Sequence, residues 1–294
     1  MQALLGNRQA KALIRFQGRT VNFDSQKVAI VIPLYNDAAN ISRAVLSAER
    51  QALPEEYTLD IIIVDDCSTD DGPEIVRELS EAHRCIRFFQ QKVNQGPSAA
   101  RNRALSETDA AWFTPLDSDD FMDPHRVGGL LKYATDNQLD LVADNLLISA
   151  ESTPKHVERT LWPGKPDGPV PLTSQLFIER SIEIDTPRSE LGYLKPLINR
   201  NTLNNDDGLP YIDELRFGED FELYSRLLLD GVRAHLIDPL GYYLIRREGS
   251  ASHSQSGLDH ERLARISRKM LQRTDLSGPE KRALKRHASY SENE

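Results

Sequence analysis

The chain has 294 residues, a formal net charge of −9 and a hydrophobic fraction of 39%. This length suits one large α/β domain or two small ones, and the acidic balance argues against nucleic acid as a partner. Cys67 and Cys85 form no CxxC pair, and no nearby His completes a zinc pattern with them. The two cysteines therefore show no zinc-binding pattern, and so small a number of cysteines fits a protein of a reducing compartment. Because no secretory signal or spanning segment of about 20 apolar residues is apparent, the sequence predicts a cytoplasmic protein.

Strand and helix patterns alternate through the first part of the chain. The run "KVAIVIPLY" is nearly continuous in β-branched and aliphatic residues, which is typical of a strand buried on both faces. We expect strands at 27–35, 59–66, 85–91 and 111–117, and helices at 41–52, 71–83 and 97–108. This alternation at short spacing predicts βαβ units, and hence an α/β protein with a mostly parallel central sheet flanked by helices.

The alternation becomes less regular towards the C-terminal half. There we expect a helix at 124–137, a strand at 139–148, a Pro/Gly-rich loop at 160–173, a helix at 218–231 and a strand at 234–247. Segment 259–287 holds nine Lys/Arg against four Asp/Glu, with Leu263, Ile266 and Met270 at helical spacing. Such an amphipathic helix suits either packing on an acidic domain or contact with an anionic membrane surface. The basic segment at the N-terminus allows the same two interpretations.

Polar residues gather where the predicted strands end. Because the carboxyl ends of parallel strands meet at one edge of a sheet, ligands bind there. Carboxylates and amides with no His or Cys suit a hard ion, Mn²⁺ or Mg²⁺, that bridges a nucleotide diphosphate. No GxGxxG follows the first strand and no GxxxxGK[ST] occurs, which excludes the familiar dinucleotide and P-loop sites. The residues concerned are Pro33, Tyr35, Asn36, Asp37, Asp65, Asp66, Ser68, Asp70, Asn94, Gln95, Gly96, Asp117, Asp119 and Asp120.

Five short sequence motifs resemble those of a known enzyme family. "VIPLYND", "IIIVDDCSTD", "NQGPSAARN", "LDSDDFMDP" and "FGEDFELYSRLL" resemble, in order and spacing, the family 2 glycosyltransferases with the GT-A fold. In detail, "LVADNLL", "LGYLKPLINR" and "IRREGSAS" are similar to bacterial exopolysaccharide glycosyltransferases of the succinoglycan type. The resemblance implies three segments: a basic N-terminal segment, a GT-A domain with a nucleotide-binding half and an acceptor half, and a basic helical tail. Their bounds are 1–26, 27–257 (divided at 125/126) and 258–294.

The resemblance also implies how a UDP-sugar is held. Pro33, Tyr35 and Asp66 match positions that hold the uracil and the ribose. Asn94, Gly96 and Arg101 match the segment "NxGxxxARN", in which Gly96 lets the backbone approach the nucleotide and Arg101 supplies donors near the base or phosphates. In the Asp-any-Asp motif, which Asp117 and Asp119 match, Asp119 would ligate the Mn²⁺ or Mg²⁺ that bridges the diphosphate. Asp117 would reach the ribose, or the ion through water.

For the chemical step, the resemblance assigns Asp220 as the base, with Glu219 beside it, in an inverting transfer. The expected donor sugar is glucose, and the expected acceptor is a saccharide, lipid-linked, in bacterial exopolysaccharide biosynthesis. The alternative is that both acids only stabilise the first turn of a helix. Arg246, Arg247 and His253 would lie in a loop that closes over the diphosphate, although Glu248 and Gly249 depart from the usual pattern.

Two further residues keep two interpretations each. His125 follows the Asp cluster but suits a surface position at a helix start, and Trp162 suits either stacking on an acceptor sugar or anchoring its loop. Other functional classes fit less well. A receiver-type signalling domain would place its acidic pair earlier and needs an unassigned lysine, and a nucleotidyltransferase needs a Gly- and Arg-rich loop after the first strand. A non-catalytic nucleotide-, carbohydrate- or calcium-binding module remains an alternative, although "DCSTDDG" does not match the EF-hand pattern.

Overall fold

The computed structural model describes residues 23–182, 189, 191–203, 210–247 and 257–292, preceded by two short strands. These strands, β1 (Ile14–Phe16) and β2 (Arg19–Val21), pair antiparallel with each other. The remaining strands form an eight-stranded sheet in the order β11-β13-β8-β12-β6-β3-β4-β5 and a four-stranded sheet in the order β10-β9-β14-β7.

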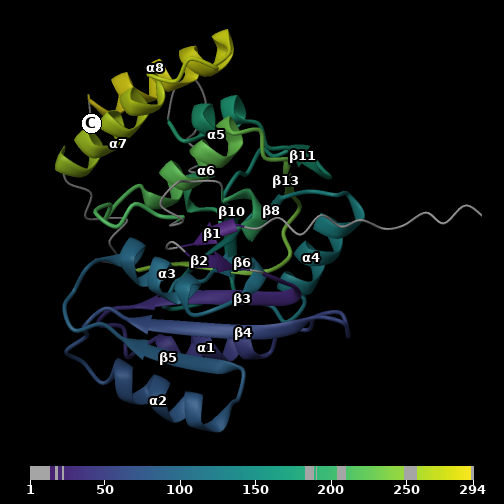
Figure 1. Ribbon diagram of the computed structural model, residues 1–294, viewed down its shortest axis with the longest axis vertical. Coiled ribbons are helices and arrows are strands. Elements are labelled where there is room, and N and C mark those ends of the chain that lie inside the picture. Colours follow the sequence, from purple (N-terminus) through teal and green to yellow (C-terminus); the bar gives the residue numbers. More distant parts are fainter. Residues whose placement is uncertain are drawn as a thin grey trace, which may run out of the picture.

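The N-terminal part of the large sheet is the parallel βαβ arrangement that the sequence predicts. Its strands β6, β3, β4 and β5 pair in parallel, and β3 and β4 are almost entirely buried. Helices α1 and α2 lie on one face and α3 crosses β3 and β4 on the other, as right-handed crossovers require (Figure 1). The bounds are β3 Asp24–Leu34, α1 Ile41–Glu49, β4 Thr58–Asp65, α2 Gly72–Ala82, β5 Ile86–Gln90, α3 Pro97–Ser106 and β6 Ala110–Pro115.

The other half of the sheet is mixed. Strand β12 (Leu197–Asn199) lies between β6 and β8 (Leu141–Asp144) and runs antiparallel to both. Strand β13 (Ala234–Ile237) pairs in parallel with β8, and β11 (Val170–Pro171) closes that edge in the antiparallel sense. Strand β12 is not predicted from the sequence, because a three-residue strand has too few positions to show periodicity.

Two predicted single strands are wrong, because each divides between the two sheets. Segment 139–148 forms β8 and then β9 (Leu147–Ala150), and segment 234–247 forms β13 and then β14 (Tyr242–Arg246). Since β13 pairs with β8 and β14 with β9, both in parallel, the neighbouring strands pass together into the small sheet. Its outer strands are β7 (Phe121–Met122) and β10 (Val157–Thr160). At the turn between β13 and β14, Gly241 has a φ of 100°.

Helices α4 (Arg126–Asp136), α5 (Ser174–Arg180) and α6 (Glu219–Leu229) belong to the second half, with the short helices η1 (Leu191–Tyr193) and η2 (Arg200–Thr202). The predicted basic tail is a hairpin of two helices, α7 (Gly257–Met270) and α8 (Gly278–Ser291), which lies over α5 and α6 (Figure 1). Ser277 and Glu280 start α8 with a capping box.

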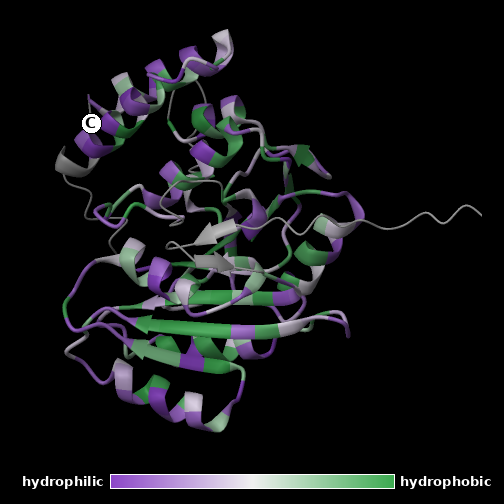
Figure 2. Cartoon of the chain, in the orientation of Figure 1, coloured by the Kyte–Doolittle hydropathy of each residue, from purple (hydrophilic) through white to green (hydrophobic). Residues whose placement is uncertain are grey.

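The α7–α8 hairpin packs by its apolar side. Leu263, Ile266 and Met270 are buried, while Arg265 and Lys269 of the same helix are exposed. Hydrophilic colour accordingly lies along much of the hairpin's outside, whereas β3 and β4 are strongly hydrophobic (Figure 2). Packing on the domain is therefore the interpretation that the structure supports for these apolar residues. No helix in the described part of the chain is long and apolar enough to cross a membrane.

Candidate active site

A cleft of about 410 Å³ lies at the carboxyl ends of β3, β4 and β6. The structure brings together in it the residues to which the resemblance gives a role in donor binding, metal binding or catalysis. Arg246 does not line the cleft, and His253 lies outside the described residues. The other polar residues expected at the strand ends do not line it either: Asn36, Asp37, Asp65, Ser68, Asp70, Gln95 and Asp120. One part of the lining comes from the strand ends and the other from α6, the chain before β12 and the α7–α8 hairpin. The expected residues are Pro33, Tyr35, Asp66, Asn94, Gly96, Arg101, Asp117, Asp119, Glu219, Asp220 and Arg247.

Asp66 organises the turn that precedes α3. Its two carboxylate oxygens accept hydrogen bonds from the backbone N–H groups of Gln95 and Gly96, each at 2.7 Å. Burial raises the pKa of Asp66, although these hydrogen bonds oppose the shift. Gly96 has a φ of 96°, a left-handed conformation that glycine adopts without strain. Tyr35, by contrast, is 52% exposed at the cleft, so its ring face is available to a planar ligand.

Arg216 is a cleft residue that the sequence analysis misses. Its guanidinium donates to the Asn94 side-chain oxygen at 2.7 Å and to the Asn94 carbonyl at 3.1 Å. A Cβ atom on Gly96 would stand 3.1 Å from the Arg216 side chain. Arg216 therefore connects the segment before α6 to the turn after β5. No local pattern identifies it, because the contact joins residues 122 positions apart.

Asp119 and Asp37 share one cation, Arg247. The Arg247 Nε atom lies 3.0 Å from Asp119 Oδ2, and Nη1 donates to Asp37 Oδ1 at 2.9 Å. Burial and the charge of Asp117 raise the pKa of Asp119 to about 6, while Arg247 lowers it. A divalent ion beside Asp119 would relieve this carboxylate repulsion, so an oxygen-only Mn²⁺ or Mg²⁺ site fits the residues present.

Within the described residues, no three His, Cys, Asp or Glu side chains are grouped to hold a metal ion.

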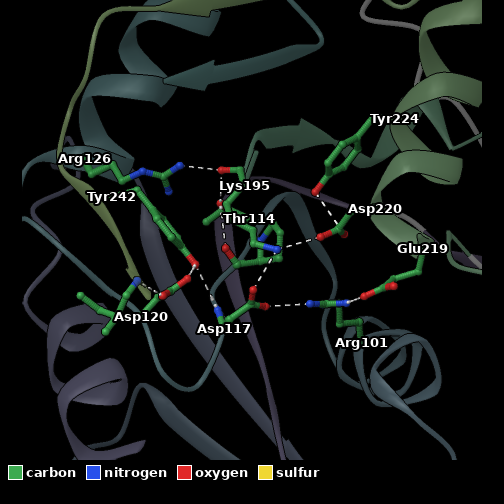
Figure 3. A network of polar contacts seen from close by, with 12 residues as sticks. Arg101, Thr114, Asp117, Asp120, Arg126, Lys195, Glu219, Asp220, Tyr224 and Tyr242 are labelled. Atoms are coloured by element: carbon green, nitrogen blue, oxygen red, sulfur yellow. Dashed lines mark hydrogen bonds and ion pairs between the residues drawn. The ribbon is translucent and has the colours of Figure 1, made fainter. Parts of the chain in front are cut away.

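Both oxygens of Asp117 are occupied by cations. Arg101 Nη2 donates to Oδ1 at 2.7 Å, and Lys195 Nζ lies 2.9 Å from Oδ2 (Figure 3). Although burial raises the pKa of Asp117, Lys195 and Arg101 hold it well below its usual range. Asp117 is therefore ionised and binds two cations. Asp119 contacts one cation, Arg247, so Asp119 has more freedom than Asp117 to approach a bound ion.

The acidic pair at the start of α6 faces the same cations. Glu219 accepts from Arg101 Nη1 at 2.8 Å, and Asp220 Oδ2 accepts from Lys195 Nζ at 2.7 Å. Tyr224 OH donates to Asp220 Oδ1 at 3.3 Å. Burial raises the pKa of Glu219, although Arg101 opposes the shift. Because both acids contact cations of the cleft, they do more than stabilise the first turn of α6.

A second layer of buried groups supports this arrangement (Figure 3). Asp120 accepts from Tyr242 OH and from the Ile245 N–H, each at 2.8 Å, and Tyr242 OH accepts from the Asp117 N–H at 3.3 Å. The Arg126 guanidinium lies 4.8 Å from the Tyr242 ring centre. Strand β14 thus fixes the turn that carries Asp117 and Asp119, and Asp120 is part of that support.

The α7–α8 hairpin completes the wall beside α6. Gly218, which precedes α6, has a φ of 76°, and a Cβ atom there would lie 2.4 Å from Leu263 Cδ2. The His287 ring stacks on Phe221, with 4.1 Å between centroids and 11° between planes. The start of α6, which bears Glu219 and Asp220, is therefore in direct contact with the C-terminal helices.

Other residues singled out in the sequence lie elsewhere. Trp162 is buried, exchanges two 2.9 Å hydrogen bonds with the Asn145 side chain, and has the Arg180 guanidinium 4.5 Å from its ring centre. It anchors the loop and does not line the cleft. His125 is an exposed residue at the start of α4. Arg246 pairs with Glu158.

Comparison with known proteins identifies the family. Residues 29–184 match the model described as Glycosyl transferase family 2. The chain belongs to this family. Succinoglycan biosynthesis protein ExoU of Rhizobium meliloti (strain 1021) is 34% identical over 270 residues, covering 90% of this chain and 75% of that protein. The ExoO protein of the same organism is 32% identical over 238 residues, covering 79% of this chain and 64% of that protein.

Solved structures identify the fold of this glycosyltransferase as GT-A. The S. aureus TarS 1–349 crystal structure in complex with UDP superposes with a TM-score of 0.67 at 20% identity, covering 91% of this chain and 73% of that one. The mannosyltransferase PcManGT from Pyrobaculum calidifontis, in complex with GDP-Man and Mn²⁺, gives a TM-score of 0.61 at 17% identity, covering 96% and 73%. The fold and the enzyme class expected from the sequence are thereby confirmed.

Proposed function

We propose that the protein is an inverting, metal-dependent glycosyltransferase that moves a sugar, glucose, from a UDP-sugar to a saccharide acceptor. The observation that carries this proposal is the single cleft that Asp66, Asp119 and Asp220 share, although they come from three distant parts of the chain. The segment 27–125 would hold the nucleotide and the segment 126–257 the acceptor.

In the proposed donor complex, Tyr35 stacks on the uracil and Asp66 accepts from its imide N–H. Asp119 would hold the metal ion, and Arg247 would then be free to contact the diphosphate oxygens in place of Asp119. Bound Mn²⁺ or Mg²⁺ would neutralise the diphosphate and make it a better leaving group. The solved TarS complex with UDP-GlcNAc and the PcManGT complex with GDP-Man and Mn²⁺ are consistent with a nucleotide-sugar donor and a metal ion in this fold.

The proposed chemical step needs one base. Asp220 takes the proton of an acceptor hydroxyl, whose oxygen forms a bond to the sugar C1 on the face opposite the diphosphate. The C1–O bond to the diphosphate breaks as the new bond forms, through an oxocarbenium-like state, and the diphosphate leaves with the electron pair. A positioned base contributes about 10² to 10⁴ in rate. Glu219, bound to Arg101, holds that cation beside the base.

The proposed acceptor is a lipid-linked oligosaccharide in exopolysaccharide biosynthesis, supported by the likeness to the two succinoglycan biosynthesis proteins. We further propose a cytoplasmic location with peripheral contact to the inner face of the membrane. The exposed basic residues of the α7–α8 hairpin support this contact, because each basic group near an anionic surface adds about 1 kcal/mol. They are Arg262, Arg265, Arg268, Lys269, Lys281, Arg282, Lys285 and Arg286.

Calorimetry and transfer assays test the catalytic proposal. Binding of UDP and Mn²⁺ is expected to be mutually dependent, and Asp119→Ala is expected to abolish that dependence. Asp123→Ala is the matched control, because Asp123 belongs to the same acidic cluster but does not line the cleft. Asp220→Asn is expected to retain donor binding and to lose transfer. UDP binding that is indifferent to metal, or normal transfer by Asp220→Asn, would contradict the assigned roles.

Vesicle flotation tests the membrane contact. The protein is expected to float with vesicles rich in phosphatidylserine and to remain behind with phosphatidylcholine vesicles. The double variant Lys281→Glu and Lys285→Glu is expected to lose the association, whereas Lys132→Glu on α4 keeps it. Equal flotation of the two variants would show that the hairpin is not the contact surface.

A further inference from the structure

Lys195 connects the side of the cleft formed by the strand ends with the side formed by the start of α6. Its ammonium lies 2.9 Å from Asp117 Oδ2 and 2.7 Å from Asp220 Oδ2 (Figure 3). The residue is 3% exposed, so these ion pairs are shielded from water and are stronger than surface pairs. Asp117 follows β6 in the nucleotide-binding half, and Asp220 starts α6 in the other half. One side chain therefore fixes the separation between the two carboxylates.

The backbone of Lys195 is held as firmly as its side chain. Its carbonyl accepts from Arg126 Nη2 at 2.6 Å and from Thr114 Oγ1 at 3.3 Å. Arg126 is itself fully buried and donates to Asp144 Oδ1 through Nε at 3.0 Å and through Nη2 at 2.8 Å. Since both ends of the side chain are fixed, the ammonium has little freedom to follow a displaced carboxylate.

The charges around Asp220 are unevenly distributed. Three carboxylates, from Asp117, Glu219 and Asp220, face the cations Arg101 and Lys195. Arg101 contacts Asp117 and Glu219, whereas Lys195 contacts Asp117 and Asp220. Among the ion pairs of the described residues, Asp220 is paired with Lys195. Without the ammonium, Asp220 would face the negative charges of Asp117 and Glu219 with no cation in direct contact among the described residues, and Arg101 would attract it only from beyond contact distance.

We propose that Lys195 is a positioning residue for sugar transfer, which holds the Asp220 carboxylate at the cleft and at a fixed distance from Asp117. The proposal rests on the proposed role of Asp220 as the base. Lys195 acts through Asp220, so its loss displaces the base while Arg101 still holds Asp117 on the donor side. The effect is confined to the transfer step.

The test is Lys195→Met, which keeps the length and apolar stem of the side chain and removes its charge. We expect kcat for transfer to fall at least about 10²-fold, the lower end of what a base contributes. The KM for the UDP-sugar and the calorimetric Kd for UDP with Mn²⁺ should change less than about threefold, which also shows that the variant folds. Lys165→Met is the matched control, because Lys165 has a 3% exposed side chain paired with Asp238 at 2.7 Å and does not line the cleft. Its kcat should be unchanged.

Two further measurements separate positioning from a general structural role. Adding Lys195→Met to Asp220→Asn should cause no further loss of kcat, because residues that act as a unit are not additive. Ethylammonium should restore part of kcat to Lys195→Ala, whereas tetramethylammonium, which cannot donate a hydrogen bond, should not. A wild-type kcat in Lys195→Met, a loss confined to KM, or full additivity with Asp220→Asn overturns the proposal.

These outcomes also separate this proposal from the function on which it rests. Wild-type transfer that needs Asp220 but not Lys195 overturns the role of Lys195 alone. Wild-type transfer that does not need Asp220 overturns the assignment of the base and, with it, the role of Lys195.

Discussion

Removal of the Asp144 carboxylate is expected to destabilise the fold strongly. Asp144 and Arg126 are both fully buried, and Asp144 Oδ1 accepts two hydrogen bonds from the guanidinium, at 3.0 and 2.8 Å. Asp144→Asn keeps the shape of the side chain but leaves Arg126 charged in a fully buried site without its counterion. Breaking a buried pair in this way costs about 3–5 kcal/mol. This cost corresponds to a decrease of about 10² to 10⁴ in the ratio of folded to unfolded protein.

Urea denaturation followed by tryptophan fluorescence measures this effect as a shift of the unfolding midpoint. Asp136→Asn is the control, because the pair of Asp136 with Lys132 lies on the surface of α4, where removing one partner should have little effect. The double variant Arg126→Met and Asp144→Leu should recover most of the stability, since it removes both charges. If Asp144→Asn unfolds at the wild-type midpoint, the ion pair of Asp144 with Arg126 does not contribute to stability as expected for a buried pair.

Three further outcomes are expected. Because Asp119, with a pKa of about 6, is largely protonated at lower pH, Mn²⁺-dependent binding of UDP-glucose should weaken by up to about tenfold per pH unit below 6. Binding that is constant from pH 5 to 7 in calorimetry would contradict this shift. Gly218→Ala should lower the melting temperature and kcat more than Gly231→Ala, since both have positive φ but only Gly218 faces Leu263; equal losses would count against the contact. Arg247→Ala should tighten binding of Mn²⁺ alone several-fold, while raising the KM for UDP-glucose, because Arg247 competes with the ion for Asp119; unchanged Mn²⁺ affinity would refute that competition.

The sequence predicts the N-terminal part of the large sheet well because its signals are local. The strand ending in Asp66 and the helix after Gly96 are short patterns with clear periodicity and turn residues, and their bounds differ from the structure by only a few positions. The site residues lie close together because the carboxyl ends of parallel strands meet at one edge of the sheet. The expected residues could therefore be gathered at one cleft without a structure.

The second half is less predictable because its determinants are distant contacts. Segment 139–148 is predicted as one strand although Asp144 and Asn145 interrupt its apolar residues where the structure divides it. The distant contact at this point is the pair of hydrogen bonds between the Asn145 side chain and the backbone of Trp162. Lys195 is one lysine in a short irregular stretch, and only the folded chain brings it to Asp117 and Asp220. Arg216 is missed for the same reason. Charge and spacing in the sequence identify which groups can interact, but not which of them meet.

The contact of Leu263 with the backbone of Gly218 has a consequence for synthesis and for proteolysis. The hairpin residues that contact the start of α6 come after residue 256, so a growing chain acquires its sheet and the Asp66 and Asp119 carboxylates well before it acquires this support. If Asp220 is the base that we propose, a fragment that lost the hairpin by cleavage between residues 247 and 257 is expected to bind UDP but not to catalyse transfer. Such a fragment is expected to compete with intact molecules for the donor.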